Sequence, residues 1–133
     1  MKYSANAPCP CHSHQKYKRC CQPYHKGSLP QTALQLMRSR YSAYALGLST
    51  YIMDTTHPDN VDYTLDRAKW HKSIEDFSHT TQFLGLTIGE VIEGETLSYV
   101  TFEARFDQGS LREKSRFYRD GHKWLYEGGE FSS

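Results

Sequence analysis

The sequence contains no apolar run close to the roughly 20 residues that a membrane-spanning helix needs. Its opening residues also lack the apolar core of a secretory signal, so we expect a cytoplasmic protein. With 133 residues, of which 38% are hydrophobic, the chain is long enough for one modest core and too short for a two-domain enzyme.

Acidic residues are absent from the first 53 positions. This stretch holds seven Lys and Arg side chains, whereas residues 54–133 hold nine basic and fifteen acidic side chains, a formal charge of −6. The net charge of +1 therefore hides a basic N-terminal part and an acidic C-terminal part. Such an asymmetry favours an acidic partner for the basic part.

Cysteine is absent after position 21. The four cysteines form the pattern C-x-C-x8-C-C at Cys9, Cys11, Cys20 and Cys21. Because the cytoplasm rarely keeps disulfides, this cluster favours a metal site over a covalent framework. Four thiolates complete the tetrahedral shell of a structural Zn²⁺, and the metal would supply the core that residues 1–28 lack. The alternative is four unmetallated thiols in a floppy tail.

Helical spacing dominates the middle of the chain, and strand alternation dominates its end. A capping box at Thr32 and Gln35 opens an apolar and aromatic stripe that predicts one long helix over residues 32–53. A second, shorter helix should begin at Asp66. Alternation with a period of two then predicts four strands, over residues 83–92, 97–106, 111–119 and 122–127.

Helices followed by a four-stranded antiparallel meander predict an α+β fold, with the helices on one face of a curved sheet. The stretch 22–30 contains two prolines and a glycine, which is typical of an ordered connector. We therefore expect a zinc-binding knuckle with its connector over residues 1–29 and an α+β domain over residues 30–133.

The cysteine segment, CPCHSHQKYKRCC at residues 9–21, resembles the SEC-C motif, the zinc knuckle at the C-terminus of the SecA preprotein translocase. The resemblance implies metal ligation by all four cysteines and contacts with an acidic chaperone surface and with ribosomes. His12 and His14 stand where that family usually has glycine, which adopts positive φ freely. Either histidine offers a competing ligand, but four thiolates already complete the shell, so we expect both histidines to face solvent.

Most of the chain also resembles the bacterial YchJ family. The matching stretches include CQPYH at 21–25, LMRSRYSAY at 36–44, FLGL at 83–86, FEARF at 102–106 and WLY at 124–126. In that family a SEC-C knuckle precedes a nuclear transport factor 2-like domain, a cone of helices packed on a curved sheet, and the function is uncharacterised. The resemblance implies this architecture here.

The first functional hypothesis is a non-enzymatic adaptor. Its knuckle would present Lys16, Tyr17, Lys18 and Arg19 to an acidic protein surface, the ribosome or RNA. Four zinc-bound thiolates lower the formal charge of residues 1–28 to about +3, which makes tight unaided nucleic-acid binding less expected. The sequence gives no sign of DNA specificity and does not decide between a monomer and a homodimer.

The alternative is a small-molecule binder or acid–base enzyme that uses a pocket inside the cone. Candidate pocket residues are Tyr41, Tyr44, Asp54, His57, Trp70 and Arg105. Four of these residues also have a structural interpretation: Tyr41 and Tyr44 as core, His57 as a capping or turn residue, and Arg105, like Arg116, as part of a surface or cross-strand ion pair.

Arg38 and Arg40 are expected to pair with carboxylates of the acidic sheet. The sequence shows no nucleophile beside a base, no phosphate-binding glycine loop and no open metal site, which favours the non-enzymatic role. A cone interior filled by its own side chains would exclude the pocket.

Overall fold

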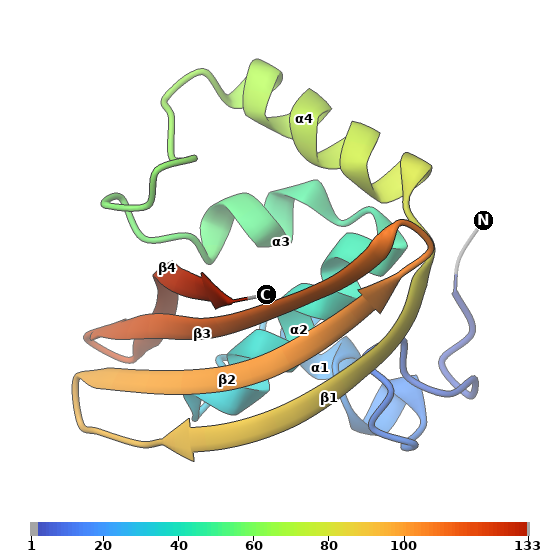
Figure 1. Cartoon of the computed structure of the whole chain (residues 1–133), viewed down its shortest axis with the longest axis horizontal. Helices are drawn as coiled ribbons and strands as arrows, with labels where there is room; N and C mark the ends of the chain where they lie inside the picture. Colours follow the sequence, from blue (N-terminus) through green and yellow to red (C-terminus); the bar gives the residue numbers. More distant parts are fainter. Residues whose placement is uncertain (1–2, 133) are drawn as a thin grey trace.

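The computed structural model describes residues 3–132, which form an N-terminal cysteine segment, a group of helices and one antiparallel sheet (Figure 1). A 3-10 turn at Tyr17–Arg19 precedes the helices α1 (Gln22–His25), α2 (Ala33–Leu46), α3 (Ser49–Asp54) and α4 (Arg67–Thr80). The strands are β1 (Phe83–Ile92), β2 (Leu97–Phe106), β3 (Gly109–Asp120) and β4 (Lys123–Ser132). Within residues 3–132, no helix has the length and apolar character to cross a membrane.

The four strands form a meander in the order β1-β2-β3-β4, with every neighbouring pair antiparallel. The sheet curves, and the helices lie together on its concave side, where α2 contacts β2 and β4 (Figure 1). The predicted α+β fold is confirmed, and β1 and β2 have the predicted bounds. Strand β4 runs five residues past the predicted end, because Gly128 and Gly129 continue the pairing with β3 beyond a bulge.

The prediction of one long helix over residues 32–53 is wrong, because Gly47 divides it. Gly47 has φ 72°, a left-handed conformation that ends α2, and its N–H donates to carbonyls of the last turn. Helix α3 then starts at Ser49. The prediction that the second helix is shorter is also wrong, since α2 and α4 each have 14 residues. Its predicted start is confirmed, because Asp66 caps the N-terminus of α4.

The cysteine segment packs on α2 and shares its core. Cys9, Cys11, Tyr17 and Cys21 belong to the same buried cluster as Leu36, Met37 and Tyr41 of α2 and Val100 and Phe117 of the sheet. Helix α2 is therefore covered on two sides, which explains why even its serines, Ser39 and Ser42, are fully buried. The division of the chain at residues 29 and 30 stays a prediction.

Candidate functional site

The four cysteine sulfurs meet at one point. All lie within 4.8 Å of one another, with 3.5 Å between the sulfurs of Cys11 and Cys20 and 3.9 Å between those of Cys20 and Cys21. These separations are far too long for disulfide bonds, and all four thiols are free. A tetrahedron with zinc–sulfur bonds of about 2.3 Å has edges of about 3.8 Å, so the donor set fits Zn²⁺.

Polar groups around the sulfurs come from the cysteine segment itself and from α2. Ser13 Oγ lies 3.2 Å from the sulfur of Cys20, and Ser42 Oγ of α2 lies 3.4 Å from that of Cys9. Nη1 of Arg38, also on α2, donates to the carbonyl of Cys11 at 3.2 Å and to its sulfur at 3.7 Å. Groups of this kind orient the ligands of metal sites, so α2 helps to position the four cysteines.

The four neighbouring thiols differ in pKa. Hydrogen bonds from Cys20 and Cys21 lower the pKa of Cys11, and the same contacts with Cys11 raise the pKa of Cys20 and of Cys21. Several thiolates this close repel one another unless a cation lies between them. A divalent metal ion supplies that positive charge, so the electrostatics of the four thiols also fit a metal ion.

The two histidines of the cysteine segment adopt a left-handed backbone conformation. His12 has φ 60° and His14 has φ 71°, a region that glycine enters freely and other residues enter rarely. His14 is exposed, as predicted. The prediction for His12 is wrong: its ring packs edge-on against Tyr41, with 5.7 Å between centroids, and its Nε2 is buried. Neither histidine belongs to the group of side chains in residues 3–132 that could hold a metal ion.

The predicted partner-binding residues divide into two groups. Lys16, Lys18 and Arg19 are exposed beside the cysteine cluster. Tyr17 is not available to a partner, because it is 5% exposed and its hydroxyl lies 2.6 Å from Nδ1 of His25. Nε2 of His25 in turn lies 2.8 Å from the carbonyl of Ser39. Tyr17 therefore helps to anchor the cysteine segment to α2.

The predicted pairing of Arg38 and Arg40 with sheet carboxylates is wrong. Arg38 contacts the cysteine cluster, as described above. Nη1 of Arg40 donates to the carbonyl of Ile52 at 3.0 Å and to the hydroxyls of Thr55 and Thr56 at 2.8 and 3.1 Å. Its guanidinium also lies 4.7 Å from the ring centroid of Tyr126. Buried carbonyls, hydroxyls and a ring, rather than acids, satisfy this cation.

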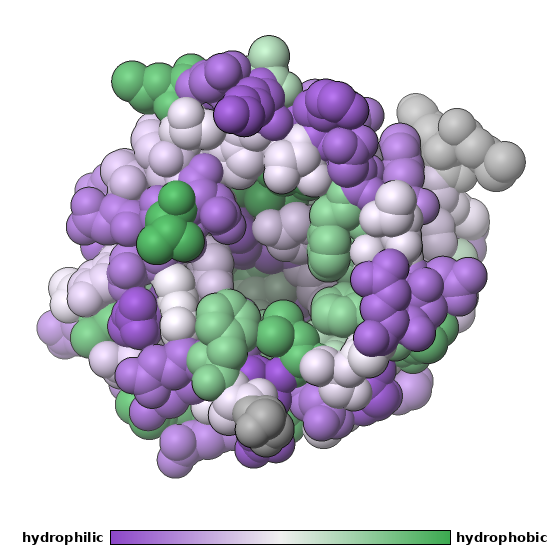
Figure 2. Space-filling view, turned by 45° about the horizontal axis from the view of Figure 1, so that its top comes forward, coloured by the Kyte–Doolittle hydropathy of each residue, from purple (hydrophilic) through white to green (hydrophobic). Residues whose placement is uncertain are grey.

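An open cavity of about 640 Å³ lies between α2, α4 and the concave face of the sheet. Figure 2 shows the hollow from outside, with hydrophobic side chains on its wall. Ten of its lining residues are aromatic: Tyr41, Tyr44, Trp70, Phe77, Phe83, Phe102, Phe106, Phe117, Tyr126 and Phe131. The interior of the cone is thus not filled by its own side chains.

Three of the six predicted pocket residues line this cavity, namely Tyr41, Tyr44 and Trp70. The other three lie elsewhere. Asp54 pairs with Arg67 at 3.1 Å on the surface, and His57 accepts a hydrogen bond from the N–H of Asp59 in a turn.

Arg105 is exposed, where it donates to Thr87 and pairs with Glu103. Arg116 forms the expected cross-strand ion pair, with 2.7 Å to Glu127 of β4.

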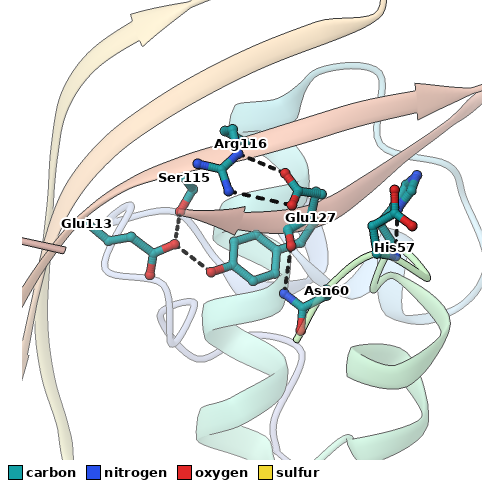
Figure 3. A network of polar contacts seen from close by, with 8 residues as sticks. His57, Asn60, Glu113, Ser115, Arg116 and Glu127 are labelled. Atoms are coloured by element: carbon teal, nitrogen blue, oxygen red, sulfur yellow. Dashed lines mark hydrogen bonds and ion pairs between the residues drawn. The ribbon is translucent and has the colours of Figure 1, made fainter. Parts of the chain in front are cut away.

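The cavity contains a buried carboxylate that the sequence interpretation missed. Glu113 of β3 is 5% exposed and lines the cavity. Its Oε2 accepts hydrogen bonds from Ser115 Oγ at 2.5 Å and from the Tyr126 hydroxyl at 2.6 Å (Figure 3). Burial, the Glu113 charge and this hydrogen bond raise the pKa of Tyr126. The available signal was the period of two in β3, which places Glu113 on the same inward face as Leu111, Ser115 and Phe117.

Gly129 of β4 makes room for this carboxylate. A Cβ atom at position 129 would lie 2.4 Å from Oε2 of Glu113 and 2.8 Å from its Cγ. Gly129 pairs with Ser115, so the missing side chain lies beside the polar group on β3. Gly129 therefore allows the placement of Glu113.

These features define a cone-shaped α+β domain with an N-terminal four-cysteine motif. The model for the middle, nuclear transport factor 2-like domain of YchJ matches residues 32–129, and the SEC-C motif matches residues 6–23. The chain therefore belongs to the YchJ family, and its relatives carry the name UPF0225.

A UPF0225 protein of Pectobacterium carotovorum is 39% identical over 129 residues, which cover 89% of this chain and 79% of the relative. One from Streptomyces coelicolor is 37% identical and covers 93% of this chain and 95% of the relative.

Solved structures show the same arrangement. The solution structure of a SEC-C motif containing protein from Rhodopseudomonas palustris has a TM-score of 0.80 at 30% identity, covering 96% of this chain and 100% of that one. The crystal structure of one from Psychrobacter arcticus has a TM-score of 0.78 at 29% identity, covering 97% and 85%. The predicted family and motif are confirmed.

Proposed function

We propose that this protein is a small-molecule-binding domain whose N-terminal segment is fixed by a structural Zn²⁺. The observation that carries the proposal is the open cavity of about 640 Å³ on the concave side of the sheet. Small-molecule sites typically measure about 300–1,000 Å³ and combine an apolar lining with a few placed polar groups. This cavity combines aromatic walls with the buried polar side chains Arg40, Glu113 and Ser115.

Zinc has a structural part in this proposal. Cys9, Cys11, Cys20 and Cys21 would hold the ion, which supplies folding free energy on the order of 10–16 kcal/mol in small four-ligand knuckles. The cysteine segment packs on α2, and α2 forms a wall of the cavity. The metal ion would therefore stabilise this wall through the cysteine segment. Metal analysis of protein purified without added zinc should give one Zn²⁺ per chain, and loss of the metal in Cys11→Ser would assign it to the cluster.

Cavity binding is tested with a neutral probe, 2-phenylethanol, followed by chemical-shift changes of Trp70. Ser73 is an exposed residue of α4 that lines the cavity, whereas its neighbour Lys72 does not. Ser73→Trp should block the cavity and weaken binding at least about tenfold, and Lys72→Trp should leave binding unchanged. An equal effect of both substitutions, or no saturable binding to the native protein, would contradict the proposal.

A second function, association of the cysteine segment with an acidic surface, is supported by the exposure of Lys16, Lys18 and Arg19. Their charges should act through the solvent, so binding would weaken as salt rises. Co-sedimentation with ribosomes is the assay. Replacement of these three residues by Glu should abolish a salt-sensitive interaction, while charge reversal of Lys69 and Lys72 on α4 serves as control. If the amount of protein that co-sediments changes neither with salt nor with the first set of substitutions, this adaptor role is excluded.

A further inference from the structure

We propose that the cavity takes a ligand with a protonated amine on a small aromatic or apolar body, and that Glu113 is the counter-ion of that amine. This inference rests on the proposed function, because it requires that the cavity binds small molecules. It names the chemical class of the ligand and the residue that selects it.

The Glu113 carboxylate has one oxygen engaged and one available. Both hydroxyl donors, those of Ser115 and Tyr126, bind Oε2. Among residues 3–132, no group donates a hydrogen bond to Oε1. Oε1 is also not one of the fully buried polar atoms that lack a partner, so part of its surface is accessible. Since Glu113 lines the cavity, Oε1 is the oxygen that a bound donor can reach (Figure 3). An ammonium group supplies such a donor together with the opposite charge.

The carboxylate also has no cationic partner in the protein. Within the described residues, Glu113 takes part in no ion pair closer than 4.0 Å. Arg40 lines the same cavity, but its Nη1 is committed to Ile52 and two threonine hydroxyls, and its plane lies over Tyr126. A buried acid without a counter-ion is costly, so a cationic ligand would offset the cost that a neutral or anionic ligand leaves in place.

The walls beside Glu113 suit the same ligand class. The rings of Tyr41, Tyr44, Phe102 and Phe117 line the cavity, and Tyr126 joins them through the hydroxyl that binds Glu113. Aromatic faces attract organic cations and cover apolar ligand bodies. Lys69 and Asp62, the other charged lining residues, are both exposed. They are in contact with solvent and do not determine the charge of the buried part of the cavity.

A glycine on the neighbouring strand also helps to set the position of Glu113. Gly129 leaves the space that the carboxylate fills, since a Cβ there would lie 2.4 Å from Oε2. Ser115 and Tyr126 then fix its direction from two strands. A solvent-facing glutamate needs neither a glycine across the ladder nor two hydroxyl donors.

The experiment compares three probes of one shape: 2-phenylethylamine, 2-phenylethanol and phenylacetate. Dissociation constants are measured by titration of the native protein and of Glu113→Gln, which keeps the shape and accepts both hydroxyl hydrogen bonds. We expect the amine to bind at least about tenfold more tightly than the alcohol, and phenylacetate to bind most weakly. Glu113→Gln should remove the preference for the amine and leave the alcohol within about threefold. Glu103→Gln, on a partly exposed acid that does not line the cavity, is the matched control.

The outcomes separate this inference from the proposed function. If the alcohol binds in the cavity and the amine binds no better, the ligand class is wrong and the binding function stands. If the amine is preferred but Glu113→Gln keeps the preference, another group selects the cation and Glu113 is not the counter-ion. If none of the probes saturates, the proposed function fails with the inference. The comparison of probes on the native protein needs no variant to fold.

Discussion

Gly129→Ala is expected to destabilise the protein only while Glu113 is present. The alanine Cβ would lie 2.4, 2.8 and 2.9 Å from Oε2, Cγ and Cδ of Glu113, distances that ordinary carbon contacts do not reach. The glutamate must therefore move. In moving it gives up hydrogen bonds from Ser115 and Tyr126, because both converge on the same oxygen.

The size of the effect follows from two contributions. Forcing extra atoms into a packed site costs about 1–3 kcal/mol, and a hydrogen bond to a charged group contributes about 1.5–3 kcal/mol. We expect Gly129→Ala to lower the free energy of unfolding by about 3 kcal/mol. In a Glu113→Ala background the clash is gone, and Gly129 is not in a left-handed conformation, so the same substitution should be neutral or stabilise by about 0.4–1 kcal/mol.

Urea unfolding of the native protein, both single variants and the double variant gives the coupling free energy between positions 113 and 129. Gly128→Ala is the internal control: its Cβ would meet only Nη2 of Arg116, at 3.1 Å, the far end of a partly exposed side chain. Its cost should stay below about 0.5 kcal/mol. Equal destabilisation by Gly129→Ala with and without Glu113 would refute the placement of this acid against β4.

Three further predictions concern the cysteine segment and the buried tyrosines. Arg38→Met, which removes a donor to Cys11, should weaken zinc retention about 10–100-fold in a chelator competition, whereas Lys18→Met should not. His14→Gly should raise the free energy of unfolding by about 0.5–1 kcal/mol, because His14 is exposed at φ 71°; a loss of stability would show that its side chain contributes. Burial raises the pKa of three tyrosines to about 12, so the folded state keeps their protons while the unfolded state loses them near pH 10. Stability should therefore fall as pH rises from about 10 to 12, and tyrosinate absorbance should show a late-titrating group; the residues are Tyr17, Tyr41 and Tyr51.

The sequence was sufficient for features that depend on local pattern. The cysteine spacing, the cap at Asp66 and the alternation in residues 83–106 each act over a few residues, and the structure has them as predicted. The one helical boundary that failed depends on Gly47, whose left-handed conformation ends α2 inside an otherwise continuous stripe. A glycine near a helix end is a known stop signal. Here the helical spacing of apolar residues continues on both sides of Gly47, so the pattern predicted one helix.

The candidate site was harder to predict, because it depends on contacts between distant segments. Tyr17 and His12 lie in a basic, polar stretch, and only the packing of that stretch on α2 buries Tyr17 and brings the His12 ring against Tyr41. Arg40 does not pair with an acid for a similar reason: α3 and the two residues after it place a carbonyl and two hydroxyl groups against its guanidinium.

Glu113 was not predicted, because two of the residues that define its surroundings are on another strand. Tyr126 and Gly129 belong to β4, and the predicted fourth strand ended at residue 127, before the second glycine. Only the full β3–β4 pairing shows that an inward acid, a hydroxyl and an empty Cβ position coincide.

The cysteine cluster and the cavity meet on opposite sides of one helix. Arg38 and Ser42 of α2 contact the sulfur ligands, while Arg40, Tyr41 and Tyr44 of the same helix line the cavity. We therefore expect a change at the cysteine cluster to act on the cavity wall through α2. If α2 couples them, removal of zinc by a chelator should weaken probe binding in the cavity as well as loosen the cysteine segment. Unchanged probe affinity in the metal-free protein would show that the sheet and α4 hold the cavity without that support.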